Sequence, residues 1–197
     1  DIKFILSTEP HFDHAGGIAA LARDTGATVV ASARGAEGLR SGRHATDDPQ
    51  LAYGGSWPAV TRLRVVRDGE VLRLGKAAIT AHATPGHTMG SMSWSWRACA
   101  GDGGDKTCKA IVFASSLNPV SSDDYRYTAP SSAPIVRAFG TTHRRMDGLA
   151  CDILISAHPD NAGEGRYNDR PGACRTYVER SRKALAKRLA DEKSEAK

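Results

Sequence analysis

Short runs of apolar residues alternate along this chain with helical patterns and with loops rich in glycine and polar side chains. The first apolar run, from Ile2 to Leu6, is typical of a buried strand, and Ile18, Leu21 and Ala22 then share one helical face. The same criteria predict further strands at residues 27–31, 60–66, 70–74, 77–82, 92–96, 110–114 and 152–157. They predict further helices at residues 33–39, 135–146 and 176–190. This interleaving predicts the α/β class with mixed sheets.

Two turns separate the three strands in the middle of the chain. Asp68-Gly69 is a strong hairpin signal between residues 60–66 and 70–74, and Gly75-Lys76 makes the next turn. A length of 197 residues suits one domain, which we place at residues 1–190. Residues 191–197 are mostly charged, and we expect them to form a disordered tail.

Composition narrows the classes of protein that fit. No apolar run approaches the roughly 20 residues that cross a bilayer, so we expect no membrane span. The net charge of +5 comes from basic residues scattered along the chain, without a nucleic-acid-binding motif. We therefore expect the basic residues to form solvated faces, and no nucleic-acid partner.

The four cysteines are placed as two pairs. Cys99 and Cys108 flank a turn-rich loop, while Cys151 opens a strand and Cys174 opens the last helix. The even count and these placements favour the disulfides Cys99–Cys108 and Cys151–Cys174, which form in oxidising compartments. Four reduced, buried thiols are the alternative.

Four of the six residues from 9 to 14 can bind a metal ion. Glu9, His11, Asp13 and His14 follow the first predicted strand and precede the first predicted helix, where open α/β sheets place their ligands. Imidazole and carboxylate groups are typical ligands of catalytic zinc. Two distant histidines, His87 and His158, also lie in loops just past predicted strands. The alternative is a polar turn in which Asp13 caps the following helix.

The segment Glu9-x-His11-x-Asp13-His14 resembles the His-x-His-x-Asp-His motif of the metallo-β-lactamase superfamily at every ligand position except the first. His87 and His158 match the single histidines that this family carries in two later loops. The chain is most similar to subclass B3 metallo-β-lactamases, from Asp1 to about Leu189. The segments that carry this likeness are His14-Ala15-Gly16-Gly17, Pro85-Gly86-His87-Thr88-x-Gly90-Ser91, Ser116-Leu117, Cys151-Asp152-Ile153-Leu154 and His158-Pro159. The Cys151–Cys174 pairing also fits that group.

The resemblance implies an αββα sandwich with metal ions in a groove between its sheets. Family members carry further strands and a helix before the segment equivalent to Asp1. We therefore expect the chain to lack the amino-terminal strands of that sandwich.

Carried over residue by residue, the resemblance implies two zinc ions. Glu9, His11 and His87 would hold the first zinc ion. Asp13, His14 and His158 would hold the second. A Glu/His/His set is a legitimate zinc triad, but Glu9 adds a negative charge that should weaken the Lewis acid. The alternative is that Glu9 swings away and zinc occupies only the second site.

The implied activity is hydrolysis of the β-lactam amide bond of antibiotics by metal-bound hydroxide, and hence antibiotic resistance in the periplasm or outside the cell. Asp13 could also orient the water. Ser116 and Asn118 match positions where family members hydrogen-bond water or the substrate carboxylate, although a polar loop that satisfies its own backbone is equally compatible. His44, His82 and His143 receive no role.

Other members of the superfamily differ after the strand equivalent to residues 110–114. Glyoxalase-type, lactonase and RNA-processing members place a metal-bridging aspartate there, whereas this chain has Ser115 and Ser116. That difference favours the β-lactamase branch. The alternatives are another metallo-hydrolase of this fold, acting on a lactone, ester or phosphodiester, and a non-catalytic metal-binding or nucleic-acid-binding domain.

Overall fold

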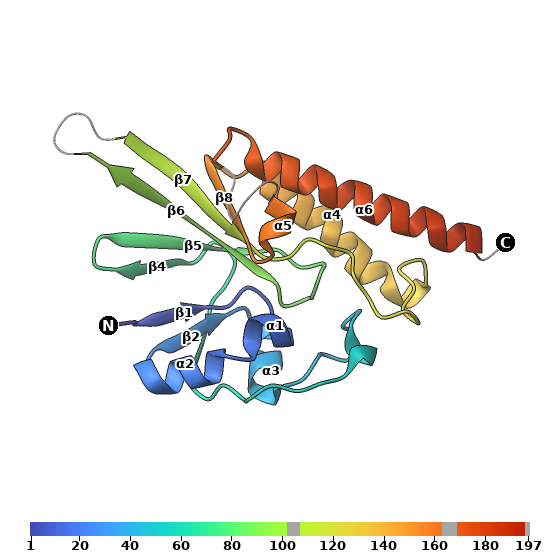
Figure 1. Cartoon of the computed structure of the whole chain (residues 1–197), viewed down its shortest axis with the longest axis horizontal. Helices are drawn as coiled ribbons and strands as arrows, with labels where there is room; N and C mark the ends of the chain where they lie inside the picture. Colours follow the sequence, from blue (N-terminus) through green and yellow to red (C-terminus); the bar gives the residue numbers. More distant parts are fainter. Residues whose placement is uncertain (102–106, 163–168, 196–197) are drawn as a thin grey trace.

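The computed structural model describes residues 1–101, 107–162 and 169–195, and within these ranges the strands form two sheets (Figure 1). The first sheet is parallel, in the order β1 (Phe4–Leu6), β2 (Thr28–Ala31) and β3 (Leu63–Val65). The second is mixed, in the order β4 (Val71–Leu74), β5 (Ala77–Ala83), β6 (Met92–Ala100), β7 (Thr107–Ala114) and β8 (Ile153–Ser156). The predicted α/β class with mixed sheets is confirmed.

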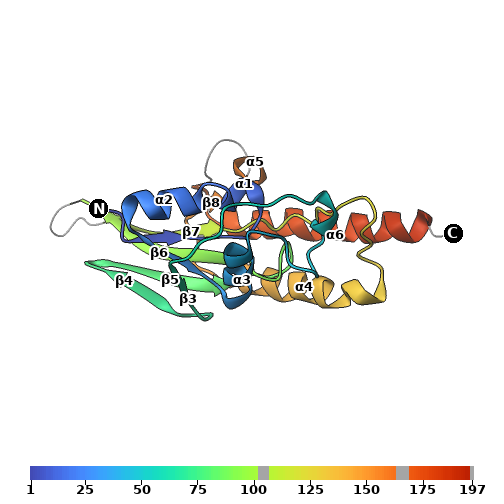
Figure 2. The ribbon, with the colours of Figure 1, turned by 90° about the horizontal axis from the view of Figure 1, so that it is seen from below.

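Helices cover the outer faces of both sheets (Figures 1 and 2). The longer ones are α2 (Ile18–Thr25), α3 (Ala33–Ser41), α4 (Ala133–Asp147) and α6 (Ala173–Glu195), and two short ones are α1 (Phe12–Ala15) and α5 (Pro159–Ala162). Short 3-10 turns lie at Leu51–Tyr53 and Pro130–Ser132. The predicted helices at residues 33–39, 135–146 and 176–190 therefore form, each extended by a few residues.

Three apolar layers show that the fold is the expected sandwich. Ile18 and Leu39 of the first helices pack with Val29 of β2 on one side. Trp94, Leu72 and Val30 fill the space between the two sheets. Leu154 of β8 packs with Met146 and Tyr177 of α4 and α6 on the other side. Because each sheet buries one face against helices and the other against its partner sheet, the order of layers is αββα.

The two predicted turns have different outcomes. Leu74 pairs with Ala77 in an antiparallel ladder, so the turn at Gly75 is a hairpin as predicted. The predicted hairpin at Asp68-Gly69 is wrong, because β3 pairs in parallel with β2 whereas β4 belongs to the other sheet. Val66, buried between the sheets, starts the crossing. The bend at Gly69 (φ 76°) therefore carries the chain from one sheet to the other.

The expected disordered tail is also corrected for residues 191–195. They continue α6 as far as Glu195. The reason is Glu192, which is buried and accepts hydrogen bonds from the backbone N–H groups of Tyr127 (3.1 Å) and Thr128 (2.8 Å). Arg188, one turn earlier, donates to the same carboxylate at 2.8 Å. Residues 196–197 lie outside the described ranges.

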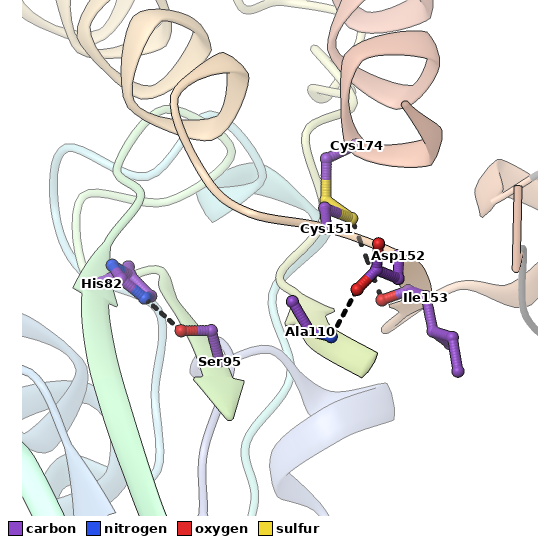
Figure 3. The surroundings of a disulfide bond; sticks show 7 residues. All are labelled: His82, Ser95, Ala110, Cys151, Asp152, Ile153 and Cys174. Carbon is purple, nitrogen blue, oxygen red and sulfur yellow. Dashed lines mark hydrogen bonds between the residues drawn. A yellow bond between two sulfur atoms is a disulfide. The ribbon is translucent and has the colours of Figure 1, made fainter. Parts of the chain in front are cut away.

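Both predicted disulfides, Cys99–Cys108 and Cys151–Cys174, are present. The first joins residues that face each other in the β6–β7 ladder. The second ties the start of α6 to the segment that leads into β8, where Asp152 also accepts a 2.7 Å hydrogen bond from the Ala110 N–H (Figure 3). Within the part of the chain that is described, no helix has the length and apolar character of a transmembrane segment.

A contact between two glycines holds the loop that carries His87 against α3. A Cβ atom on Gly90 would lie 2.6 Å from the backbone nitrogen of Gly35. The Ser32 hydroxyl, which caps α3, also donates to the Gly90 carbonyl oxygen at 2.7 Å. Glycine at position 90 is therefore required by packing between distant segments.

Gly90→Ala is expected to lower the free energy of unfolding by about 2 kcal/mol, because overpacking against backbone forces the two segments apart. For a chain of this size the melting temperature should fall by roughly 4–8 °C in thermal unfolding. The matched control is Gly17→Ala, since a Cβ there meets no atom within 4 Å and Gly17 has a φ of −93°. Equal melting temperatures for the two variants would contradict the packing argument.

Candidate metal centre

The residues from 9 to 14 leave the end of β1 and enter the short helix α1. The Ser7 N–H donates to the Val30 carbonyl at 3.0 Å, and the Met92 N–H donates to the Thr8 carbonyl at 2.8 Å, so both sheets hold this segment. Asp13 and His14 are consecutive residues of α1. Asp13 caps no helix, because the N-cap of α2 is Gly17 without a side-chain hydrogen bond. The capping alternative for Asp13 is therefore wrong.

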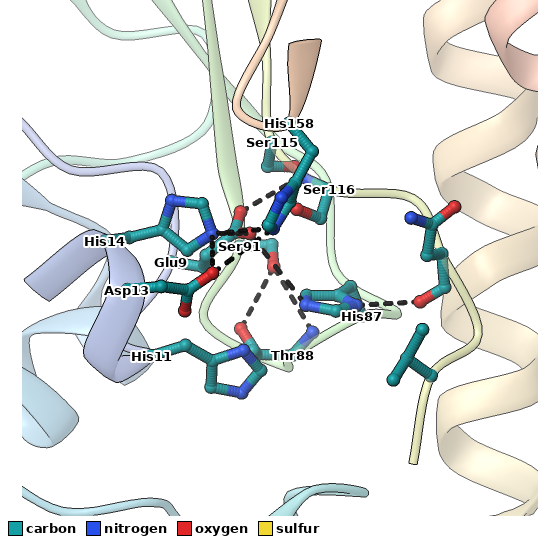
Figure 4. A network of polar contacts seen from close by, with 12 residues as sticks. Glu9, His11, Asp13, His14, His87, Thr88, Ser91, Ser115, Ser116 and His158 are labelled. Carbon is teal, nitrogen blue, oxygen red and sulfur yellow. Dashed lines mark hydrogen bonds and ion pairs between the residues drawn. The ribbon is translucent and has the colours of Figure 1, made fainter. Parts of the chain in front are cut away.

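Asp13, His14 and His158 come together from two separate segments (Figure 4). His14 Nε2 lies 3.1 Å from His158 Nε2 and 3.2 Å from Asp13 Oδ2, and His158 Nε2 lies 3.3 Å from the same carboxylate oxygen. Ligand atoms about 2.0–2.1 Å from a tetrahedral zinc ion are separated by roughly 3.3 Å. The three donor atoms therefore have the spacing that one zinc ion requires.

Glu9 lies at the centre of the cluster and is buried. Its Oε2 atom accepts a 3.0 Å hydrogen bond from the Ser116 N–H. Its Oε1 atom lies 3.1 Å from His14 Nε2 and 3.8 Å from His87 Nε2, but it forms no well-aligned hydrogen bond within the described residues. Glu9 therefore has one oxygen anchored by backbone and one oxygen aimed between the two histidines, an arrangement that suits a metal ligand.

His11 and His87 lie edge to face, with ring centroids 4.9 Å apart. His87 Nδ1 donates to the Asn118 carbonyl at 2.7 Å, so its Nε2 atom carries the free lone pair. His87 thus lies near both His11 and Glu9, but Glu9 Oε1 lies closer to His14 than to His87. The division into a first trio and a second trio stays a prediction.

The electrostatics of the metal-free cluster favour metal binding. Burial alone raises the pKa of Glu9, but the adjacent His14 imidazole, the nearby His87 and the Ser116 amide outweigh it and lower that pKa to about 2. Burial lowers the pKa of His87, so its imidazole is neutral and its lone pair is available. Burial also acts to lower the pKa of His14, but Glu9 and Asp13 outweigh it and raise that pKa. Because metal ligands must be deprotonated, a proton on His14 would compete with zinc.

A cavity of about 300 Å³ opens beside these residues. Its lining comprises His11, Asp13, Gln50, His87, Asn118, Val120, His158, Asp160 and Asn161. Asn118 is thus placed where a substrate could contact it. Ser116 is fully buried instead, and its hydroxyl oxygen has no hydrogen-bond partner among the described residues. The substrate or water contact expected of Ser116 and Asn118 stays a prediction.

Three polar residues of the long loop after α3 were not expected at the site. Asp48 lies 3.0 Å from His11 Nε2, His44 approaches Asp48 at 3.8 Å, and Gln50 Nε2 lies 3.4 Å from His87 Nε2. The residues that could bind metal therefore include a second group, His11, His44 and Asp48, beside the group of Glu9, His14 and His158. The only sequence signal was the length and irregularity of the loop with its Asp47-Asp48-Pro49 segment.

Comparison with known proteins gives consistent results. Residues 1–95 match the family model described as the metallo-beta-lactamase superfamily. A solved structure, described as the first B3 metallo-beta-lactamase with an active site glutamic acid, is 76% identical to this chain with a TM-score of 0.94. The similarity covers 98% of this chain and 71% of that chain. MEM-A1, a subclass B3 metallo-beta-lactamase from a soil metagenome library, is 41% identical with a TM-score of 0.89, over 99% of this chain and 77% of that chain.

The curated relatives are more distant. Hydroxyacylglutathione hydrolase of Rhodobacter capsulatus is 34% identical over 93 residues, which are 47% of this chain and 28% of that protein. A hydroxyacylglutathione hydrolase-like protein of Bos taurus is 30% identical over 155 residues, or 78% of this chain and 62% of that protein. The chain therefore spans less than two thirds of the length of either curated relative.

Proposed function

This chain belongs to the metallo-beta-lactamase superfamily, and from that premise we propose that the whole protein is a zinc-dependent β-lactamase of subclass B3. The observation that carries the proposal is the spacing of 3.1–3.3 Å among the donor atoms of Asp13, His14 and His158, which come from two distant segments. Two imidazole nitrogens and one carboxylate oxygen at this mutual spacing match both the ligand types and the ligand separation of a catalytic zinc ion. The β-lactam substrate is supported by the B3 relatives.

The residues have distinct parts in this proposal. Asp13, His14 and His158 hold one zinc ion, and Glu9, His11 and His87 hold the other. Bound zinc supplies a water molecule of lowered pKa and polarises the amide carbonyl.

The groups around the zinc ions position water and substrate. Asp13 is more exposed than the other ligands and faces the cavity, so it can orient the attacking water. Asn118 lies in the cavity wall, where it can bind the substrate carboxylate, and the free hydroxyl of Ser116 can bind water.

The branch of the superfamily is inferred from the end of β7. Ser115 directs its hydroxyl to Thr84 at 2.8 Å, and Ser116 uses its N–H to hold Glu9. Neither side chain can supply the bridging carboxylate expected of the thioester-, lactone- and RNA-cleaving branches. A β-lactamase therefore fits better than the hydroxyacylglutathione hydrolases named among the relatives.

We also infer where the protein works and how it is organised. Two disulfides favour an oxidising compartment, and hence the periplasm or the exterior of the cell. Residues 1–190 with the continuation of α6 form one metallo-β-lactamase domain.

The test of the proposed function is a hydrolysis panel on the full-length protein. Nitrocefin and a carbapenem should be hydrolysed, a chelator should abolish the reaction, and added zinc should restore it. S-lactoylglutathione, a lactone and a phosphodiester are the competing substrates. Faster turnover of any of these three would replace the β-lactamase proposal with the other branch.

Glu9→His is expected to lower the pH at which kcat is half-maximal by about one unit, because it removes a negative charge beside the metal and a pKa unit corresponds to about 1.4 kcal/mol. Glu9→Gln is the matched control, since it removes the same charge while keeping a side chain that the Ser116 N–H can reach. The pH dependence of kcat and the zinc content per chain are the measurements.

The zinc content separates the two hypotheses about Glu9. The anchored position of Glu9 predicts two zinc ions per chain in the wild type. A single zinc ion under zinc excess in the wild type, rising to two in Glu9→His, would instead mean that Glu9 does not bind metal.

A further inference from the structure

We propose that Asp48 is a positioning residue that fixes His11 as a zinc ligand through Nδ1, and this inference rests on the proposed zinc-dependent function. Asp48 lies in the long loop between α3 and β3, 37 residues from His11 in the sequence. Asp48 is not among the residues that line the cavity beside the metal ligands. Its contribution is the contact it makes with His11.

The contact between Asp48 and His11 is short and buried from solvent. His11 Nε2 lies 3.0 Å from Asp48 Oδ2 and 3.2 Å from Oδ1, and only 4% and 2% of the two side chains are exposed. A buried carboxylate needs a hydrogen-bond donor, so the proton of the neutral imidazole is placed on Nε2. The lone pair is then on Nδ1, on the ring edge that is not engaged by Asp48.

The loop holds the Asp48 carboxylate rigidly. Oδ1 accepts a 2.8 Å hydrogen bond from the Gln50 N–H, and the Asp48 N–H donates to the Ala45 carbonyl at 3.1 Å. The ring of His44 lies beside Oδ2 and meets Trp57 edge to face, with ring centroids 5.3 Å apart. Trp57 itself is buried in the apolar layer under α3. Packing in the helix layer of the sandwich therefore fixes Asp48, and Asp48 in turn fixes the orientation of the His11 ring.

The partner ligand His87 is fixed by a different kind of acceptor. Its Nδ1 donates to the backbone carbonyl of Asn118 at 2.7 Å, which leaves Nε2 for the metal. A carboxylate is a stronger acceptor than a carbonyl, and it raises the basicity of the imidazole that donates to it. Asp48 therefore makes His11 the stronger metal ligand of the two, and its charge acts on the zinc in the same direction as that of Glu9.

A different use of the same residues is a third metal position between His11, His44 and Asp48, whose candidate ligand atoms lie within 4.8 Å of one another. The distances favour the positioning role. His44 Nδ1 is 3.8 Å from Asp48, wider than the 3.1–3.3 Å among Asp13, His14 and His158. Such a metal would also take the Nε2 atom of His11, so that His11 would have to bind two metals through both ring nitrogens.

The experiment compares Asp48→Ala and Asp48→Asn with the wild type in the full-length protein. Zinc affinity is measured by competition with a chromophoric chelator, and the His11 tautomer is read from ¹⁵N NMR of the zinc-loaded protein. Asp48→Ala should lower the affinity for one of the two zinc ions by about 10–100-fold, the usual effect of losing the carboxylate that is hydrogen-bonded to a histidine ligand. Asp48→Asn retains an acceptor without charge, so its effect should be smaller. The wild type should show the His11 proton on Nε2.

The control is Asp47→Ala, which removes the neighbouring carboxylate. Asp47 is about half exposed and pairs with Arg34 at 2.7 Å, so its loss changes the charge of the loop without touching His11. It should leave zinc affinity unchanged. Unfolding of the metal-free proteins is recorded in parallel to establish that each variant folds. If Asp48→Ala does not fold, Asp48→Asn alone provides the test.

The outcomes separate this inference from the proposed function. Wild-type zinc affinity in both Asp48 variants, or a His11 proton on Nδ1, would overturn the positioning role. Three zinc ions per wild-type chain, with one lost in Asp48→Ala, would overturn it in favour of the third metal position. Absence of β-lactam turnover in a wild type that still shows the expected zinc affinity and tautomer would overturn only the proposed function.

Discussion

Replacement of His14 by alanine is expected to lower kcat/KM for β-lactam hydrolysis by roughly 10³-fold, which is about 4 kcal/mol of transition-state stabilisation. The reason is the position of Nε2, which lies 3.1 Å from Glu9 Oε1, 3.1 Å from His158 Nε2 and 3.2 Å from Asp13 Oδ2. Without this imidazole, the second zinc position retains one exposed carboxylate and one half-exposed histidine. Both the affinity for zinc and the alignment of the water depend on the lost ligand.

Steady-state kinetics at a fixed zinc excess, with the zinc content of each preparation, measure this effect. His82→Ala is the matched control, because His82 is buried and hydrogen-bonded to Ser95 Oγ at 2.7 Å, outside the group of metal ligands. His82→Ala should leave kcat/KM and zinc content near the wild-type values. A loss of less than tenfold in His14→Ala, with two zinc ions still bound, would show that His14 is not a ligand.

Removal of the Cys151–Cys174 disulfide, by alanine at both positions, is expected to lower the free energy of unfolding by about 3 kcal/mol. The bond closes a loop with a sequence separation of 23 residues, and Cys174 is buried in the layer between α6 and the second sheet. In thermal unfolding the melting temperature should fall by roughly 6–12 °C for a chain of this size.

Alanine at Cys99 and Cys108 is the comparison for the second prediction. That bond closes a separation of 9 residues, and its two ends already face each other in the β6–β7 ladder. Its removal should therefore cost less, because the hydrogen bonds of the ladder still hold the strands together. A larger loss of stability from the Cys99–Cys108 pair would contradict this account of the two bonds.

The position of Glu9 connects the stability of the fold with the chemistry of the site. Glu9 Oε2 is held by the Ser116 N–H at the end of β7. Glu9 Oε1 faces the imidazole of His14, which lies in α1. The first sheet delivers Glu9, His11, Asp13 and His14, and the second sheet delivers His87 and His158. The cluster of candidate ligands therefore forms only when both sheets are packed, so loss of packing at Gly90 should also disturb the site.

The sequence by itself determined the features that depend on local pattern and residue chemistry. Apolar periodicity was sufficient for the strands and for the helices α2, α3, α4 and α6, and the motif from Glu9 to His14 was sufficient to identify the candidate ligands. The positions of the cysteines were sufficient for both disulfides. Each of these inferences uses residues that are close in the sequence or that have a distinctive chemistry.

Only the tertiary structure decided the features that depend on contacts between distant segments. Asp68-Gly69 has the composition of a hairpin turn, yet the parallel pairing of β3 with β2 places the strands on either side of it in different sheets. The helical course of residues 191–195 depends on the contact of Glu192 with Tyr127 and Thr128.

The same is true within the site. Asp48 behind His11, and Glu9 between His14 and His87, were decided by the packing of the two sheets and their helices. The physical reason is that a local pattern reports which face of an element is buried, whereas the partner that covers that face is chosen by the packing of the whole chain.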